Sequence, residues 1–276
     1  MREITDLKEL QAIELDILLF VDKVCRENQI KYFLCGGTAL GAIRHKGFIP
    51  WDDDIDIMMP RPDYEKFLTI MDCQTQTRYQ CFHFGKKRPN WYHTYAKVAD
   101  THTVLVNNNT DIKGLGVLID VFPLDGINPK TVQKDYRKFE RAEHLLALPT
   151  YKTFKKVPHS PNKLKNFLKF LAYWPMKLCS IKFLNQRAQK IMKKYPWDYS
   201  EYYGKYYGYG MKENFPRTLL DDVIEVEFAG HKFPLMKDYD RYLTSLYGDY
   251  MTPPTQDELV GIGHEQKVYW QDVPTE

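Results

Sequence analysis

Four aspartates within five positions form the feature that most constrains what this chain can fold into. They lie at residues 52–56, where the chain reads DDDID and an isoleucine follows. On a strand, side chains alternate between two faces, so Asp54 and Asp56 would point the same way while the isoleucines enter the core. Two carboxylates held side by side repel each other unless a cation lies between them. The pattern predicts a strand over 54–59 that carries a metal-binding pair.

The metal that suits this pair is Mg²⁺, because it prefers carboxylate oxygens together with phosphate oxygens. Two such ions about 3.5–4 Å apart would hold the attacking and the leaving oxygen of a phosphoryl displacement. A solvated acidic loop is an alternative that stays open. A calcium loop fits less well, because Ile57 stands where its glycine is required and Asp63 where its bidentate glutamate is required.

A glycine turn precedes the acids. Cys35-Gly36-Gly37-Thr38 follows a strand-like stretch and opens a helical pattern. Two glycines let the backbone approach a ligand closely, and the N–H groups of a first helical turn attract an anion. Thr38 would add a hydroxyl donor or cap the helix. A plain turn remains the alternative, but the spacing to the aspartates places the two motifs on neighbouring strands.

A third carboxylate interrupts a later apolar stretch, VLIDVF, at Asp120. A charge in such a place is costly unless a cation or hydrogen bonds compensate it. Asp125, just after Pro123, competes for the same role, although it also suits a turn before Gly126.

Periodicity assigns the remaining elements. Helical patterns cover 5–29, 38–46, 63–71 with Asp63 as its cap, 130–148, 151–195 and 238–251. Strand patterns cover 30–37, a hairpin over 91–106, a strand over 116–125 stopped by Pro123, and a strand pair over 223–236, with loops at 107–116 and 202–210. We expect a mixed α/β (α+β) sheet core in residues 1–150, a basic amphipathic helical segment in 151–200, and a C-terminal α+β segment in 201–276 that packs on the core.

Composition excludes several classes of protein. No stretch approaches about 18 uninterrupted apolar residues, which argues against a membrane-spanning helix. The five cysteines are odd in number and show no CxxC spacing, which argues against a disulfide framework and a zinc site. The N-terminus is polar and carries no apolar signal segment. We therefore expect a cytoplasmic protein.

Residues 151–195 contain twelve Lys or Arg residues and no Asp or Glu. Apolar residues recur there at helical spacing: Leu164, Phe167, Leu168, Leu171, Trp174, Leu178 and Ile181. Such a helix can lie on an anionic membrane surface, which would place the protein peripherally at the inner face of the membrane. An ordinary packed helix with its lysines in water is the alternative. No recognition motif for nucleic acid accompanies the charge, so no nucleic-acid partner is expected.

The stretch CGGTALGAIRHKGFIPWDDDIDIMMPRPDYEKF, with GVLIDVFPLDGI, resembles the LicD family over about residues 30–126, and LYGDYMTPP is a weaker echo. These are bacterial transferases with a cytidine diphosphate donor, related to fukutin and fukutin-related protein, which transfer ribitol phosphate. The order of strand, glycine turn, helix, DID strand and later acidic strand also resembles the nucleotidyltransferase superfamily typified by DNA polymerase beta. The resemblance implies that fold for the sheet core.

The resemblance also implies a reaction: Mg²⁺-dependent transfer of phosphocholine from CDP-choline to a sugar hydroxyl of a lipid-linked, polyanionic glycan precursor such as a teichoic acid. It implies these roles: Gly36, Gly37 and Thr38 as donor-phosphate ligands, Asp54 and Asp56 as paired Mg²⁺ ligands, Asp120 as a third metal ligand or a general base, and His45 and Lys97 as further donor contacts. The choline ammonium would need an aromatic enclosure. Candidates for it are Trp51, Trp91-Tyr92 and the run Tyr202–Tyr209.

Other readings remain open. The same fold could transfer another CDP-linked polyol phosphate or a nucleotidyl group. A metal-dependent glycosyltransferase also uses a DxD pair, although it does not require a glycine turn ahead of the acids. A membrane-attached binding module with a degenerate site is the non-enzymatic alternative.

Overall fold

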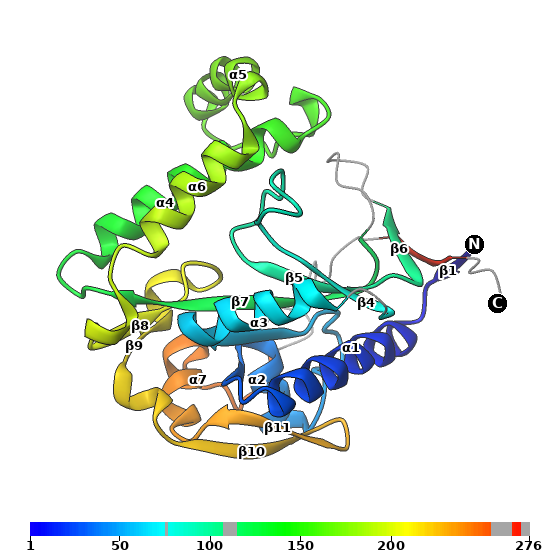
Figure 1. The fold of residues 1–276 in the computed structure, drawn as a ribbon. Helices are drawn as coiled ribbons and strands as arrows, with labels where there is room; N and C mark the ends of the chain where they lie inside the picture. The colour runs from blue at the N-terminus through cyan, green and yellow to red at the C-terminus, as the bar shows by residue number, and fades with distance from the viewer. Residues whose placement is uncertain (75–76, 107–114, 255–266, 272–276) are drawn as a thin grey trace.

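The acidic stretch belongs to a mixed sheet in the computed structural model, which describes residues 1–74, 77–106, 115–254 and 267–271 (Figure 1). Five strands follow the order β2-β3-β7-β5-β4, and β8 and β9 extend this sheet from β7. Their bounds are Phe33–Leu34 (β2), Asp56–Pro60 (β3), Tyr79–Phe82 (β4), Ala96–Asp100 (β5), Leu118–Ile127 (β7), Tyr202–Gly204 (β8) and Asn214–Pro216 (β9). β3 and β7 run parallel, and the other neighbours run antiparallel. The predicted mixed α/β architecture is confirmed.

Helices and smaller strands surround this sheet. The helices are Leu7–Glu27 (α1), Gly36–His45 (α2), Arg61–Cys73 (α3), Val132–Ala147 (α4), Lys163–Leu178 (α5), Ile181–Met192 (α6) and Tyr239–Tyr247 (α7). Short 3-10 turns are Leu148–Thr150 (η1), Phe154–Lys156 (η2), Trp197–Tyr199 (η3), Gly210–Glu213 (η4) and Arg217–Leu220 (η5). The other strands are Arg2–Ile4 (β1), Thr103–Val106 (β6), Val223–Phe228 (β10), His231–Met236 (β11) and Lys267–Trp270 (β12). Within the described residues, no helix combines the length and the apolar character needed to cross a membrane.

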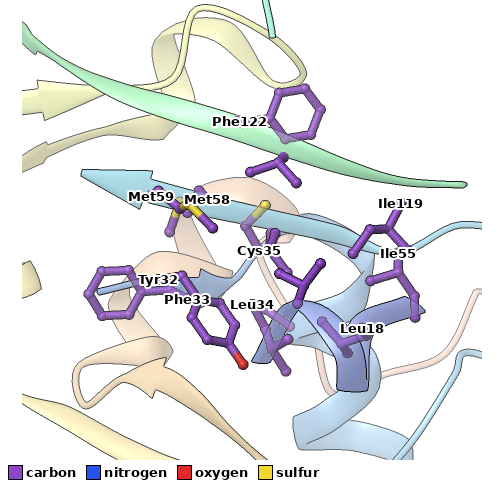
Figure 2. Packing of buried hydrophobic residues seen from close by; sticks show 14 of the residues in the cluster. Leu18, Tyr32, Phe33, Leu34, Cys35, Ile55, Met58, Met59, Ile119 and Phe122 are labelled. Atoms are coloured by element: carbon purple, nitrogen blue, oxygen red, sulfur yellow. The ribbon is translucent and has the colours of Figure 1, made fainter. Parts of the chain in front are cut away.

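The largest apolar core lies between the sheet and α1. The side chain of Asp6 caps α1 by accepting the Lys8 N–H at 3.0 Å, and the apolar stripe of the helix then contacts β5 and β7. Figure 2 shows Leu18 of α1 beneath Ile55 and Ile119 of the sheet, and all three are fully buried. Burying such a side chain stabilises the fold by about 1.5–3 kcal/mol. Ile55, between Asp54 and Asp56, therefore holds the acidic stretch against the core.

β7 continues through Pro123, so the prediction that this proline stops the strand is wrong. Proline lacks the N–H that a strand interior normally donates. On one side of β7, however, β5 ends its pairing at Val121 and β8 begins its pairing at Asp125. Pro123 falls in the gap between these two partners, where no donor is needed.

The strands expected over 91–106 form, but not as a hairpin. β5 pairs with β4 and β7, whereas β6 pairs with β12 in a small sheet that β1 completes. The Thr103 hydroxyl donates to the Asp100 carbonyl at 3.0 Å and accepts the Val117 N–H at 2.8 Å, which turns the chain away from β5. Residues 107–114 of the expected polar loop lie outside the described residues.

Two further expectations are corrected. α3 begins at Arg61 instead of 63, with Pro62 in its first turn, and Asp63 accepts the Lys31 N–H at 3.0 Å instead of capping the helix. The segment 202–210, which was expected to be a loop, contains the strand β8. This strand pairs with β7, and its Tyr203 is buried, with an exposed fraction of 1%.

α4 and α6 pack side by side as an arm that extends from the sheet, and α5 lies at the tip of this arm (Figure 1). The helical pattern predicted over 151–195 is confirmed in part: residues 163–178 and 181–192 are α-helical, whereas 151–162 contain the short 3-10 turn η2 instead. The C-terminal elements lie on the main core instead: Phe215, Phe228, Phe233 and Tyr242 all belong to its buried cluster.

Asp125 is a structural residue of β7 and not a third acid of the site. Its carboxylate is 1% exposed and accepts two hydrogen bonds from the Arg61 guanidinium, at 2.7 Å from Nε and 2.5 Å from the terminal nitrogen. The pair joins the first turn of α3 to β7. A buried ion pair of this kind leaves an uncompensated charge when one partner is removed.

We predict that Arg61→Met lowers the free energy of unfolding by about 3–5 kcal/mol, because Asp125 stays buried without its cation. The double variant Arg61→Met with Asp125→Leu should recover most of this loss, since both charges are then absent. Urea unfolding of the two variants measures the difference. Equal losses in the single and the double variant would contradict the assignment.

Candidate active site

Three charged side chains stand in a row across the middle of the sheet. Asp56 on β3 lies opposite Asp120 on β7, and Asp120 lies opposite Lys97 on β5. Residues in register on adjacent strands point to the same face of the sheet. Lys97 Nζ lies 2.5 Å from Asp120 Oδ1, and the lysine is only 9% exposed. The structure therefore brings together three of the side chains that the sequence singles out.

β3 begins at Asp56 instead of at the predicted Asp54, so Asp54 lies two residues before the strand, where it lines the same site. Ile55 is fully buried between it and Asp56, so the predicted alternation is confirmed. The Asp120 N–H donates to the Ile55 carbonyl at 2.9 Å, which continues the β3–β7 pairing to this point. Asp54, Asp53, Lys97 and Asp120 line a cavity of about 280 Å³.

The electrostatics of Asp56 reflect this crowding of carboxylates. Burial raises the pKa of Asp56 to about 8, and the negative charges of Asp54 and Asp120 add to the rise. The positive charges of Lys205 and Lys97 act in the opposite direction and lower it. The site therefore favours either a proton or an additional cation at Asp56.

A further carboxyl, Glu14 of α1, lines the same cavity. It is 2% exposed, and its Oε2 has no hydrogen-bond partner within the described ranges. Burial, with the added charges of Asp54 and Asp53, raises the pKa of Glu14 well above its usual range. Glu14 was not among the candidates predicted from the sequence, although the sequence carries a signal for it. Glu14 occupies a position of the apolar stripe of α1, between Leu10 and Leu18, where an acid has no structural reason to be.

The donor set fits a hard divalent cation in its chemistry. Mg²⁺ prefers carboxylate oxygens, and the raised pKa of Asp56 and the unpartnered oxygen of Glu14 both point to negative charge left uncompensated. Among the residues that the structure describes, however, no three His, Cys, Asp or Glu side chains lie close enough together to hold a metal ion. The assignment of Asp54, Asp56 and Asp120 as Mg²⁺ ligands therefore stays a prediction.

The glycine turn opens α2 directly against these acids. Gly36 has φ of +55°, and a Cβ on it would lie 3.4 Å from Asp56 Oδ2. A Cβ on Gly37 would lie 2.8 Å from Asp52 Oδ2, closer than side chains tolerate. Glycine is therefore required for conformation at Gly36, whereas a side chain at Gly37 would displace the flexible carboxylate of Asp52. The expected placement of turn and acids on neighbouring strands, β2 and β3, is confirmed.

Two hydrogen bonds of the turn are internal to the protein. The Gly36 N–H donates to the Tyr242 hydroxyl oxygen at 2.9 Å, and the Asp56 N–H donates to Thr38 Oγ1 at 2.8 Å. Thr38 thus fixes the start of β3, and the first amide of the turn is already engaged. A donor-phosphate role for Gly36, Gly37 and Thr38 stays a prediction.

A buried lysine from the C-terminal segment contacts Cys35, the residue before the two glycines of the turn. Lys205 is 2% exposed, and its Nζ lies 3.2 Å from Glu213 Oε1, which in turn accepts the Tyr242 hydroxyl at 3.2 Å. Burial alone would lower the pKa of Lys205, but the nearby Cys35, Glu213 and Asp56 raise it above its usual value. The sequence pattern predicts a loop at this residue. Its signal was a single lysine amid a tyrosine- and glycine-rich run.

His45 lies at the opposite end of α2 from the acids. The helix separates it from Gly36 by nine residues, or about 13 Å of helical rise. Arg44 Nε donates to its Nε2 at 2.9 Å, and burial together with the Arg44 charge lowers the pKa of His45. The structure therefore does not bring His45 to the carboxylate row, and its role as a donor contact stays a prediction.

An aromatic groove of about 650 Å³ runs along α2 between these two ends. Its lining includes Gly37, Arg44 and Asp52 as well as the aromatic side chains of Trp51, Tyr209, Tyr247 and Tyr250. Two of the aromatic residues singled out in the sequence, Trp51 and Tyr209, therefore meet here. Trp91 instead packs in a small apolar cluster at 5% exposure.

The raised pKa of Asp56 predicts a specific pH dependence of stability in the absence of divalent cations. Because its pKa rises from 3.8 to about 8 on folding, the stabilising contribution of the protonated form is fully present below about pH 4 and lost as pH rises through 8. Asp56→Asn should therefore gain on the wild type by on the order of 1–3 kcal/mol across this range. Urea unfolding in a chelating buffer measures it, with the exposed Asp221→Asn as control. Parallel pH profiles of wild type and Asp56→Asn would contradict the prediction.

Comparisons with known proteins show which family the chain belongs to. A family model described as LicD/FKTN/FKRP, nucleotidyltransferase domain, matches residues 29–163. The lipopolysaccharide cholinephosphotransferase LicD of Haemophilus influenzae is 31% identical over 271 residues, which cover 94% of this chain and 96% of that protein. Two uncharacterized rickettsial proteins match shorter stretches: RT0683 of Rickettsia typhi at 36% over 78 residues (28% of this chain and 25% of that one), and RP689 of Rickettsia prowazekii at 54% over 37 residues (13% and 14%). A similarity that extends through nearly the whole of both chains, on a sheet that aligns the expected acids, shows that this chain belongs to the LicD family.

Proposed function

We propose that this protein is a phosphotransferase with a nucleotidyltransferase-type core that moves phosphocholine from CDP-choline to a sugar hydroxyl of a surface glycan precursor. The observation that carries the proposal is the register of β3 and β7, which sets Asp56 beside Asp120 next to a glycine turn. The cholinephosphotransferase from Haemophilus influenzae, similar over nearly its whole length, supports phosphocholine as the group transferred.

The reaction requires one bond to form and one to break at the same phosphorus. The acceptor oxygen bonds to the phosphorus that bears choline, while the bond from this phosphorus to the bridging oxygen breaks and CMP leaves with both electrons. The hydroxyl proton passes to a carboxylate. In-line placement of the two oxygens and neutralisation of the phosphoryl charge supply the acceleration.

The charged residues of the site have separate roles in this reaction. Asp54 and Asp56 would hold Mg²⁺, which when bound supplies positive charge to the phosphoryl oxygens. Lys97 holds the Asp120 carboxylate in place at 2.5 Å and adds a fixed positive charge beside the reacting phosphorus. Asp120 lines the cavity of about 280 Å³, where an acceptor hydroxyl would reach it. Two roles suit Asp120: a third metal ligand, or the base that takes the proton.

The aromatic groove along α2 is our candidate for the choline headgroup. Trp51, Tyr209 and Tyr247 contribute aromatic rings to the lining, and Asp52 and Asp249 add carboxylates. Quaternary ammonium ions bind in such surroundings through cation–π attraction. Among the described residues that line the groove, Arg44 alone is positively charged, and its guanidinium donates to the Tyr250 carbonyl at 3.0 Å.

The acceptor would be a lipid-linked, polyanionic glycan such as a teichoic acid precursor, and the enzyme would act in the cytoplasm or peripherally at the inner face of the membrane. The basic residues of the arm suit a polyanionic partner. The donor could instead be a CDP-linked polyol phosphate, a nucleoside triphosphate or a nucleotide sugar. Transfer assays with each donor in turn would identify it.

We predict that Asp54→Asn and Asp120→Asn each lower kcat for transfer from CDP-choline by at least about 100-fold, because each removes a charge that acts on the reacting phosphorus. Donor turnover with CDP-choline, CDP-ribitol and UDP-sugars measures this, and Asp221→Asn is the matched surface control. If Asp120 is a metal ligand, its variant also loses Mg²⁺ affinity in calorimetry. If it is the base, Mg²⁺ affinity is retained. Full activity in either variant would refute the proposal.

A second prediction concerns the groove. Trp51→Leu should raise KM for CDP-choline by about tenfold, the loss expected for one desolvated cation–π contact. KM for CDP-glycerol, which carries no ammonium group, should change much less. Trp51→Phe should restore most of the difference, and Tyr199→Leu, at a side chain that is 89% exposed, is the control. Equal changes for both donors would instead place the nucleoside in this groove.

A further inference from the structure

The amphipathic helix α5 is oriented with its apolar face outward. Large apolar side chains form one continuous face along it, and they are 52–90% exposed: Leu164, Phe167, Leu168, Leu171, Trp174 and Leu178. Phe183 at the start of α6 is also 61% exposed. A surface helix normally buries its apolar stripe against its own protein. Exposed apolar surface gathered in this way marks an interaction site.

The opposite face of α5 is the one that contacts the protein. Tyr173 is 2% exposed and packs with Leu148 and Val157. On this inner side Lys169 Nζ donates to the Pro158 carbonyl at 2.6 Å, and Lys177 Nζ donates to the Pro149 carbonyl at 2.9 Å. Turning the apolar face inward would break these bonds and expose Tyr173. The outward orientation is therefore built into the hairpin.

Charge identifies the occupant of this face. Residues 151–195 carry twelve Lys or Arg residues and no acidic residue. A second copy of the chain docked on the same face would bring lysines against lysines, which repel. An anionic surface would attract them, at about 1 kcal/mol for each basic residue close to it. Exposed tryptophan and leucine with flanking lysines is also the composition of helices that lie in the membrane interface.

The position of α5 allows a flat partner to reach it. The helix lies at the tip of the arm that α4 and α6 form, away from the sheet and the carboxylate row (Figure 1). The main contact of α5 with another element is with the short turn η1. A planar surface could therefore receive the apolar face without meeting the rest of the fold first.

We propose that α5 is a membrane-docking helix, which inserts its apolar face among the headgroups of an anionic bilayer while the exposed Lys163 and Lys165 of α5 and Lys182 of α6 contact the lipid phosphates. The evidence for this docking surface is its exposure and its charge, so the proposal does not depend on the transfer reaction.

Vesicle co-sedimentation tests the proposal. The wild type should bind vesicles of phosphatidylcholine mixed with phosphatidylglycerol more tightly than vesicles of phosphatidylcholine alone, and salt should weaken the binding. The double variant Leu171→Glu with Trp174→Glu should bind the anionic vesicles at least about tenfold more weakly, because it removes apolar area and adds negative charge. Replacing the exposed Lys163, Lys165 and Lys182 by Gln should reduce the preference for the anionic vesicles.

The matched control is Tyr199→Glu with Val223→Glu, which adds the same charge at two exposed apolar side chains outside the arm. It should bind vesicles nearly as well as the wild type, apart from the general effect of two negative charges. Binding of cytidine nucleotides by the α5 variant should be unchanged, which confirms that the fold and the donor site are intact. Equal vesicle binding by the α5 variant and the control would overturn the proposal. The proposal would also be overturned if the wild type did not bind vesicles and eluted as a dimer in size-exclusion chromatography, while the α5 variant eluted as a monomer.

Discussion

The parallel pairing of β3 with β7 is the constraint on which the site depends. It sets Asp56 beside Asp120 in one register, and a slip by a single residue would turn one of these carboxylates into the core. The fully buried Ile55, Ile57 and Ile119 resist such a slip, because it would bring them to the polar face. Like charges are thus held together by apolar packing around them, and the raised pKa of Asp56 results first from its burial and then from the repulsion of Asp54 and Asp120.

Features encoded over a few residues could be predicted from the sequence. The alternation through Asp54 and Asp56 depends only on strand geometry, and the glycine pair before a helical pattern indicates its own turn. Asp120 was identifiable because a charge inside an apolar strand needs a partner, and the structure supplies Lys97. The effect of Pro123 could not be predicted in the same way. Whether a strand tolerates proline depends on where its neighbours begin and end, which is not a local property.

Contacts that distant segments make with the site could not be predicted from local sequence patterns. Lys205 reaches the glycine turn from 170 positions after Cys35, and the separation of β6 from β5 depends on pairing with β12 near the other end of the chain. Glu14 is intermediate between these cases. Its place in an apolar stripe is visible in the sequence, but the acids that surround it are brought there only by the packing of α1 on the sheet.

The bond between the Gly36 N–H and the Tyr242 hydroxyl links the opening of α2 to a helix some two hundred positions later. The family model ends at residue 163 and begins at 29, so it contains neither this tyrosine nor Lys205 nor Glu14. Some of the contacts that support the glycine turn therefore come from outside the region that the family model covers. Unfolding of α7 would leave the buried Gly36 N–H without its acceptor, so we expect the glycine turn and α7 to open together.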